Sequence, residues 1–306
     1  MDEKLLLIVN PYSGKGRMKI ELLPVVEIFS NAGYEVTVYP TKARGDATLH
    51  VSRLREKSYD IIVVCGGDGT LNEVISGLML SPLDCKIGYI PAGTLNEWSS
   101  GLNISRNILC AAKDVHKGKN ITLDIGKFGD KYFTYTASFG AFTSASYTAP
   151  QNLKNVLGHA AYILEGIKSL GNIKPISLEL ICDDKKIEGD FLFGAVTNSM
   201  SVGGVVKFDS SSVDLNDGYF EVLLIRNPSN IFKLQPLIDG ILKKELNKEG
   251  MEFFHAKRIV VKSDEKIAWT LDGEFAESNG SIVIENLHNA VNLIVPEINE
   301  NEDRRK

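Results

Sequence analysis

The sequence has few cysteines, no long apolar run and no excess of positive charge. Its four cysteines are scattered over 306 residues without a C-x-x-C pair, which argues against a zinc site or a disulfide framework. No apolar run approaches the roughly 20 residues of a membrane-spanning helix. A formal net charge of −5 gives no support for nucleic acid as a partner. The first residues are acidic and the following apolar run is short, so we expect no signal peptide and a cytoplasmic protein.

The hydrophobic pattern changes near residue 121. Before that point, short apolar runs such as LLLIVN and IIVVC alternate with segments of helical spacing, which predicts a doubly wound parallel sheet. After it, strand-like runs follow one another closely, and two helices are expected at roughly 152–170 and 229–245. We therefore predict an α/β domain over 1–121, an antiparallel β-sandwich domain with flanking helices over 122–296, and a charged tail over 297–306.

Three glycine-containing loops each join a predicted strand to a predicted helix. They are NPYSGKG from Asn10, GGDGTLNEV from Gly66 and PAGTLNEW from Pro91. Glycines let backbone amides approach phosphate closely, and a helix N-terminus adds free N–H groups and a positive dipole end. Since loops after parallel strands share one sheet edge, the three together favour a polyphosphate site over tight turns alone. The spacing of a Walker A loop is absent.

The pentapeptide GTLNE occurs twice, at 69–73 and 93–97. In each copy a threonine precedes a glutamate by three residues, which predicts a helix capping box for both. Asp68 precedes the first copy only. A carboxylate aimed at polyphosphate requires an intervening cation, so Mg²⁺ is implied.

These loops, in this order and spacing, resemble the catalytic domain of the diacylglycerol kinase family, specifically its soluble bacterial lipid kinases. The resemblance extends to LNDGYFEV at 215–222 and LDGEF at 271–275, so it covers nearly the whole chain. GGDGT alone is less specific, because NAD kinases and phosphofructokinases carry similar loops. The resemblance implies an ATP- and Mg²⁺-dependent transfer of the γ-phosphoryl group to the hydroxyl of diacylglycerol or a related lipid, which gives phosphatidic acid or its analogue.

The resemblance also implies that the first domain binds the nucleotide. The glycine loops, and the threonine that ends the second predicted strand, match the family's ATP contacts. The implied ATP-binding set is Asn10, Pro11, Tyr12, Ser13, Gly14, Thr41, Gly66, Gly67, Asp68, Gly69, Thr70, Leu71, Asn72, Thr94 and Asn96.

Acidic residues are the candidates for chemistry, because phosphoryl transfer to an alcohol needs a cation, positioning and a base. The family's D-G-E catalytic motif corresponds to Asp272, Gly273 and Glu274. We assign Glu274 as the base and Asp272 as its partner, an order that the sequence leaves open, and we add Asp68 as a third catalytic residue. A plain hairpin turn at Asp-Gly is the structural alternative.

The resemblance implies two cation sites. A structural cation is expected at Asp214, Asp217 and the Tyr219 backbone, and catalytic magnesium is expected near Asp124, through waters, and Glu97. The family usually has aspartate at the position of Glu97, followed by Phe-Ala rather than Trp-Ser. Glutamate keeps the charge but moves the carboxylate outward, and magnesium geometry is strict, so a slower enzyme or an altered specificity is conceivable.

The acceptor is the least determined part of this prediction. Small and apolar residues dominate 136–167 and 201–208 and could line a cleft for an acyl chain, although a core helix and a buried strand are the favoured explanation. A lipid acceptor implies transient contact with the inner face of the membrane, for which the mildly basic stretch 243–262 is a candidate. A homodimer is compatible with the sequence. The alternatives are an NAD kinase and a non-catalytic regulator that binds nucleotide or lipid.

Overall fold

The computed structural model describes residues 3–16, 18–93, 96–140, 174–202, 206–208, 213–228, 234–243, 245–246 and 248–297. It divides into two compact units, Met1–Leu123 together with Asn289–Lys306, and Asp124–His288. The helix predicted at 152–170 lies outside the described residues. None of the described helices has the length and apolar character needed to cross a bilayer.

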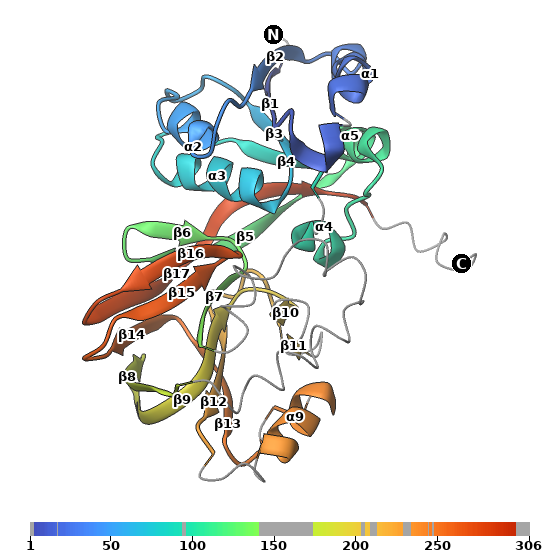
Figure 1. Ribbon diagram of the computed structural model, residues 1–306. Coiled ribbons are helices and arrows are strands. Elements are labelled where there is room, and N and C mark those ends of the chain that lie inside the picture. Colours follow the sequence, from blue (N-terminus) through green and yellow to red (C-terminus); the bar gives the residue numbers. More distant parts are fainter. Residues whose placement is uncertain are drawn as a thin grey trace. The chain divides into compact units, whose positions relative to one another are not determined.

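The first unit contains a parallel sheet with strand order β4-β3-β1-β2. Helices α1 and α5 lie on one side of these strands, and α2 and α3 lie on the other (Figure 1). Because both faces are covered, every residue of the IIVVCG strand is buried. The strands are β1 (Lys4–Val9), β2 (Glu35–Pro40), β3 (Ile61–Gly66) and β4 (Lys86–Pro91); the helices are η1 (Ser13–Gly16), α1 (Met18–Asn31), α2 (Asp46–Val51), α3 (Asp68–Met79), α4 (Glu97–Gly101) and α5 (Ile108–Lys117). The predicted doubly wound α/β fold is confirmed.

The sheet of the first unit gains a strand from the other end of the chain. The last part of β17 (Ser281–Val295) pairs in parallel with β4, with Asn292 opposite Lys86 and Leu293 opposite Ile87. From the sequence, these residues are expected in the second domain.

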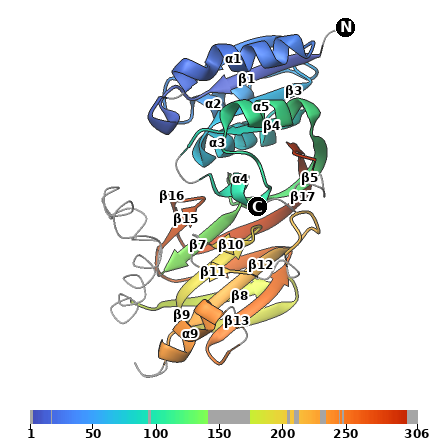
Figure 2. The ribbon, with the colours of Figure 1, turned by 90° about the vertical axis from the view of Figure 1, so that its right-hand side faces the viewer.

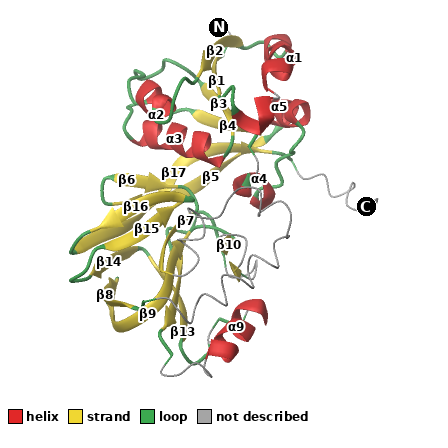
Figure 3. Ribbon diagram, in the orientation of Figure 1, coloured by secondary structure: helices red, strands yellow, loops and turns green. Residues whose placement is uncertain are grey.

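The described part of the second unit consists mainly of antiparallel strands, whereas most of the described helices lie in the first unit (Figure 3). β9 pairs with β7, β8 and β12, and β12 pairs in turn with β13. The described elements are β5 (Lys119–Phe128), which begins in the first unit, β6 (Lys131–Phe133), β7 (Thr136–Gly140), β8 (Ile176–Cys182), β9 (Lys185–Thr197), β10 (Ser201–Val202), β11 (Val206–Lys207), β12 (Phe220–Arg226), α9 (Leu234–Lys243), β13 (Met251–Ala256), β14 (Arg258–Lys262), β15 (Ile267–Leu271) and β16 (Glu274–Ser278).

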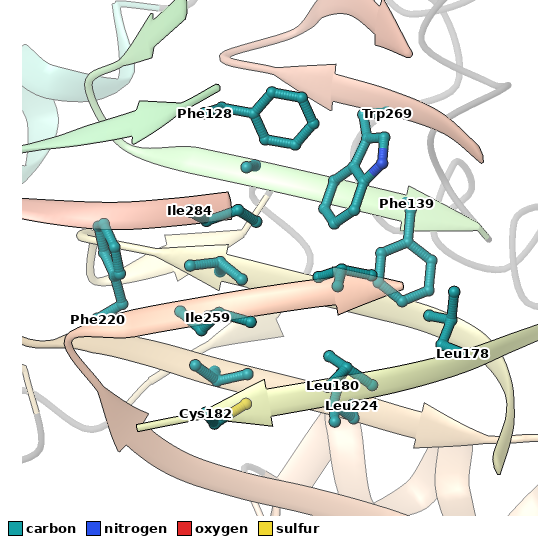
Figure 4. Close-up of a cluster of buried hydrophobic side chains, with 14 of the residues drawn as sticks. Phe128, Phe139, Leu178, Leu180, Cys182, Phe220, Leu224, Ile259, Trp269 and Ile284 are labelled. Atoms are coloured by element: carbon teal, nitrogen blue, oxygen red, sulfur yellow. The ribbon is translucent and has the colours of Figure 1, made fainter. Parts of the chain in front are cut away.

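Alternate side chains of β12 enter two different cores. Val222 and Leu224 pack in a cluster built around Trp269, whose ring lies 4.9 Å from that of Phe139 between centroids (Figure 4). Leu223 faces the opposite side and belongs to a second cluster, which α9 helps to form. Figure 2 shows β9, β12 and β13 side by side with α9 next to them. Strands such as β12, which are buried on both faces, explain the dense apolar runs of the second unit. The predicted β-sandwich is confirmed.

Candidate active site

Two glycine loops of the first unit touch at their backbones. A Cβ on Gly67 would lie 3.2 Å from the Cα of Gly93, and one on Gly93 would lie 2.6 Å from the Cα of Gly67. Ala92 N also donates to Gly66 O at 2.7 Å. Only glycine permits this approach, so the loops that precede the two GTLNE helices form one surface of backbone groups.

The third loop joins the same surface. Asn10 Nδ2 donates to Thr70 Oγ1 at 3.1 Å, which ties the NPYSGKG loop to the start of α3. Gly14 has φ +57°, and a Cβ there would overlap the carbonyl oxygen of Ala92. Thr41, which follows β2, is buried and donates its N–H to Val9 O at 2.8 Å. The structure thus brings all three loops and Thr41 to one edge of the sheet.

Asn96, one of the predicted ATP contacts, holds its own loop closed. Its Oδ1 accepts from Gly93 N at 3.0 Å and its Nδ2 donates to Gly93 O at 2.9 Å. Tyr89 OH donates to the same Oδ1 at 3.3 Å. Burial raises the pKa of Tyr89, and the charge of Asp68 raises it further. Tyr89 therefore lies beside both the PAGTLNEW loop and Asp68, a position that an apolar strand sequence does not reveal. Thr94 lies outside the described residues.

The capping boxes predicted for GTLNE are wrong. Helix α3 begins at Asp68 with Gly67 as its N-cap and no side-chain cap, so Thr70 is already inside the helix. Helix α4 begins at Glu97, whose side chain is not described, with Asn96 as N-cap. Glu73 instead caps another helix: its carboxylate accepts from Gly45 N at 2.8 Å and from Ala47 N at 3.2 Å, at the start of α2.

The D-G-E motif lies in the β15–β16 hairpin of the second unit. Asp272 and Gly273 form its turn, both with positive φ, at 49° and 86°. The Asp272 carboxylate is buried and accepts four hydrogen bonds: from Thr134 N at 2.6 Å, Thr134 Oγ1 at 2.7 Å, Tyr135 N at 3.0 Å and Thr136 N at 2.9 Å. Burial raises the pKa of Asp272, and these hydrogen bonds oppose that rise. Glu274, in contrast, is exposed.

Asp124 is fully buried and lies against the LNDG loop. Its Oδ2 accepts from Gly218 N at 2.7 Å, and its Oδ1 lies 3.0 Å from His288 Nδ1. Asn198 Nδ2 donates both to Asp124 O and to Leu215 O. With both carboxylate oxygens engaged, Asp124 is suited to holding the loop in place.

The loop itself offers oxygen atoms to a cation. Asp217 Oδ1 accepts from Tyr219 N at 2.8 Å, and Asp214 Oδ1 accepts from Asn216 N at 3.3 Å. Both carboxylates are exposed. Two carboxylates and a backbone carbonyl are the oxygen donors that Mg²⁺ or Ca²⁺ uses, completed by water, so the donor set fits a cation. Within the described ranges, no group of three or more His, Cys, Asp or Glu side chains could hold a metal ion.

Glu221 is an unusual acid that sequence reasoning missed. It is fully buried in β12, inside the apolar run FEVLLIR. Burial raises the pKa of Glu221 to about 8, and the charges of Asp217 and Asp214 contribute to the rise. A single acid at the start of an apolar strand is the only sequence signal, and an exposed strand end explains it equally well.

Two family models match the chain. A diacylglycerol kinase catalytic domain matches residues 4–128. A YegS C-terminal NAD kinase beta sandwich-like domain matches residues 137–295. The first match contains the three glycine loops, and the second contains the D-G-E hairpin.

Similar proteins occur among curated sequences and solved structures. A diacylglycerol kinase of Bacillus subtilis (strain 168) is 34% identical over 294 residues, which cover 95% of each chain. A diacylglycerol kinase of Staphylococcus aureus (strain MRSA252) is 34% identical over 278 residues, covering 90% of this chain and 87% of the relative. A crystal structure from Bacillus anthracis str. Sterne has a TM-score of 0.80 at 27% identity and covers 96% of this chain and 95% of that one. Since this similarity extends over nearly its full length, the chain belongs to the diacylglycerol kinase family.

Proposed function

We propose that this protein is an ATP- and Mg²⁺-dependent lipid kinase that phosphorylates the hydroxyl of diacylglycerol or a close analogue, giving phosphatidic acid or its analogue. The observation that carries the proposal is the convergence of three glycine loops at one edge of the parallel sheet. Backbone N–H groups and the N-terminus of α3 provide donors for a polyphosphate there. Membership of a kinase family supports ATP as the phosphate donor.

The hairpin acids have different roles in this proposal. Glu274 is exposed and takes the proton of the acceptor hydroxyl. The oxygen of that hydroxyl attacks the γ-phosphorus of ATP, and ADP leaves. Asp272 has its oxygens occupied by N–H and O–H donors, so it fixes the hairpin rather than carrying a proton. We also propose that the nucleotide binds to a domain that ends near residue 121 and that the hairpin acids belong to the domain that follows it.

Mg²⁺ would neutralise charge on the phosphate oxygens when bound. We assign its binding to Asp68 and Glu97, with Asp124 supporting the separate cation loop at Asp214 and Asp217. A lipid acceptor also requires the protein to reach a membrane surface, so we propose a cytoplasmic protein with transient peripheral contact.

The proposal is tested by incubating the purified protein with labelled ATP, Mg²⁺ and a panel of acceptors that includes dioctanoylglycerol, a sphingoid base, undecaprenol and NAD. We expect phosphorylated dioctanoylglycerol, and loss of product with EDTA. Single Asp68→Ala, Glu97→Ala and Glu274→Ala proteins should lose most activity, while Glu277→Ala, an exposed change on the strand of Glu274, should keep it. A folded wild type that binds no ATP would refute the proposal.

An NAD kinase is the second candidate, because the second unit matches an NAD kinase beta sandwich-like model. Phosphorylation of NAD but not of any lipid in the same panel would establish it.

A further inference from the structure

A row of polar side chains crosses one face of the second unit's sheet. Thr136 of β7 lies opposite Thr197 of β9, which lies opposite Glu221 of β12, which lies opposite His255 of β13. Residues directly opposite each other in antiparallel strands share a face. Thr136, Thr197, Glu221 and His255 therefore form one line, the polar row.

Most of the other side chains on this face are apolar, apart from Ser138 of β7, which lies opposite Ala195. The next side chains along the same strands include Ala195 and Leu223, followed by Phe193, Ile225 and Met251, all of which belong to one buried cluster. The polar row thus borders a buried apolar cluster.

Several atoms of the polar row are buried with no hydrogen bond. Among the described residues, Thr136 Oγ1 and both carboxylate oxygens of Glu221 have no partner in hydrogen-bond geometry, and Glu221 is 0% exposed. The backbone N–H of Ser199 lies close enough to favour the charged carboxylate and so opposes the rise in the pKa of Glu221. His255 Nε2 lies 4.0 Å from Glu221 Oε1, which is too far for a hydrogen bond. Thr197 differs, since its Oγ1 donates to Tyr135 O. A buried carboxyl group with so few bonding partners carries a desolvation cost, which a hydrogen bond to a bound ligand would offset.

One end of the polar row is bonded to the D-G-E hairpin. Thr136 N donates to Asp272 Oδ1 at 2.9 Å, and Asp272 N donates to Thr136 O at 2.9 Å. The row therefore begins at the hairpin that bears the candidate base, Glu274.

We propose that the polar row, with Glu221 at its centre, binds the hydroxyl-bearing head group of the lipid acceptor; the inference rests on the proposed function. The Glu221 carboxyl group is placed to bond a polar hydrogen of the head group, and the Thr136 hydroxyl can donate to an ester oxygen. A molecule that is polar at one end and apolar at the other matches a polar row bordered by apolar side chains. Glu221 and Thr136 are thus specificity residues.

The test compares Glu221→Gln and Thr136→Val with the wild type, using dioctanoylglycerol as acceptor. Glu221→Gln should raise KM for dioctanoylglycerol up to about tenfold, the upper end of the usual effect of losing one hydrogen bond, and should change KM for ATP less than about twofold. Thr136→Val should act in the same direction. Glu277→Gln, at an exposed ion pair with Lys266, is the matched control and should change neither constant.

The head-group site would be overturned if KM for dioctanoylglycerol were unchanged in both variants. It would also be overturned if KM for dioctanoylglycerol and KM for ATP rose equally. If thermal unfolding shows that Glu221→Gln does not fold, Thr136→Val decides alone, because it removes only the unpartnered hydroxyl in an isosteric change. If the wild type phosphorylates no lipid, calorimetric binding of dioctanoylglycerol separates the two proposals. Binding weakened in both variants keeps the site while the kinase proposal fails, whereas absent or unaltered binding overturns the site.

Discussion

At the residue scale, the two acids of the D-G-E turn have opposite surroundings. Asp272 is buried and receives four hydrogen bonds from Thr134, Tyr135 and Thr136, whereas Glu274 is exposed one residue beyond the turn. Adjacent carboxylates in one motif can therefore serve structure and chemistry separately.

Asp272→Asn and Glu274→Gln should separate these roles. An amide at 272 offers one acceptor oxygen and turns its NH₂ toward N–H donors, so we expect a loss of about 2–3 kcal/mol in unfolding free energy. Glu274→Gln should leave stability unchanged and lower kcat roughly 100-fold or more, as loss of a general base does. Urea unfolding and steady-state kinetics on the same samples provide the measurement. Equal destabilisation by both changes would contradict the assignment.

At the element scale, contacts between neighbouring loops and helices shape the edge of the first unit that carries the three glycine loops. Glu73 of α3 caps the N-terminus of α2, and Thr48 Oγ1 of α2 donates back to Glu73 O at 2.9 Å. The segment from Thr41 to Gly45 connects β2 to this cap. Glu73 therefore links helix α3 to the loop that follows strand β2.

Glu73→Ala should lower the unfolding free energy by about 1 kcal/mol, the usual cost of a lost helix cap, and should raise KM for ATP because Thr41 lies just before the capped segment. Glu27→Ala, an exposed change in α1, is the control and should alter neither quantity. Thermal unfolding and ATP titration provide the two readings. An ATP KM equal to that of the wild type would mean that the cap serves α2 alone.

Gly14→Ala should weaken ATP binding much more than Gly33→Ala. Both glycines have positive φ, at 57° and 91°, so both substitutions introduce backbone strain of about 1 kcal/mol. Only the Cβ at 14 would overlap the Ala92 carbonyl and push apart the first and third loops, while Gly33 has open space. Equilibrium binding of ATP measures the difference, and similar affinities in the two variants would argue against contact between these loops.

At the scale of the whole molecule, the first unit is made from both ends of the chain. The end of β17 pairs with β4, and its Val291, Leu293, Ile294 and Val295 are buried. The sheet of the first unit therefore depends on residues about 200 positions further along the sequence than β4.

A chain ending at His288 should therefore lose the first unit's stability. Removing four buried apolar side chains, each contributing about 1.5–3 kcal/mol, eliminates a free energy comparable to the whole stability of a domain of about 5–15 kcal/mol. A chain ending at Glu297 retains all of β17 and is the control. Circular dichroism melting and ATP binding should separate the two chains; a truncated protein that melts like the control would refute the role of β17.

The sequence by itself determined the fold class and the location of the glycine loops, because these depend on local signals. Continuous apolar runs separated by helical spacing indicate a buried parallel sheet, and glycines at strand ends mark close backbone approach. The β-rich second domain was predictable for the same reason, because strand-like runs that follow one another closely, with turn residues between them, indicate antiparallel strands.

Only the tertiary structure decided what the individual acids do. The donors to Asp272 lie at 134–136, the partners of Glu73 lie on a different helix, and the neighbours of Glu221 come from strands β9 and β13. Each of these contacts depends on strand register or helix placement, which residues far apart in sequence fix together. A local motif such as GTLNE therefore predicts a helix start, while the bonding partners of its glutamate follow from the packing of α2 against α3.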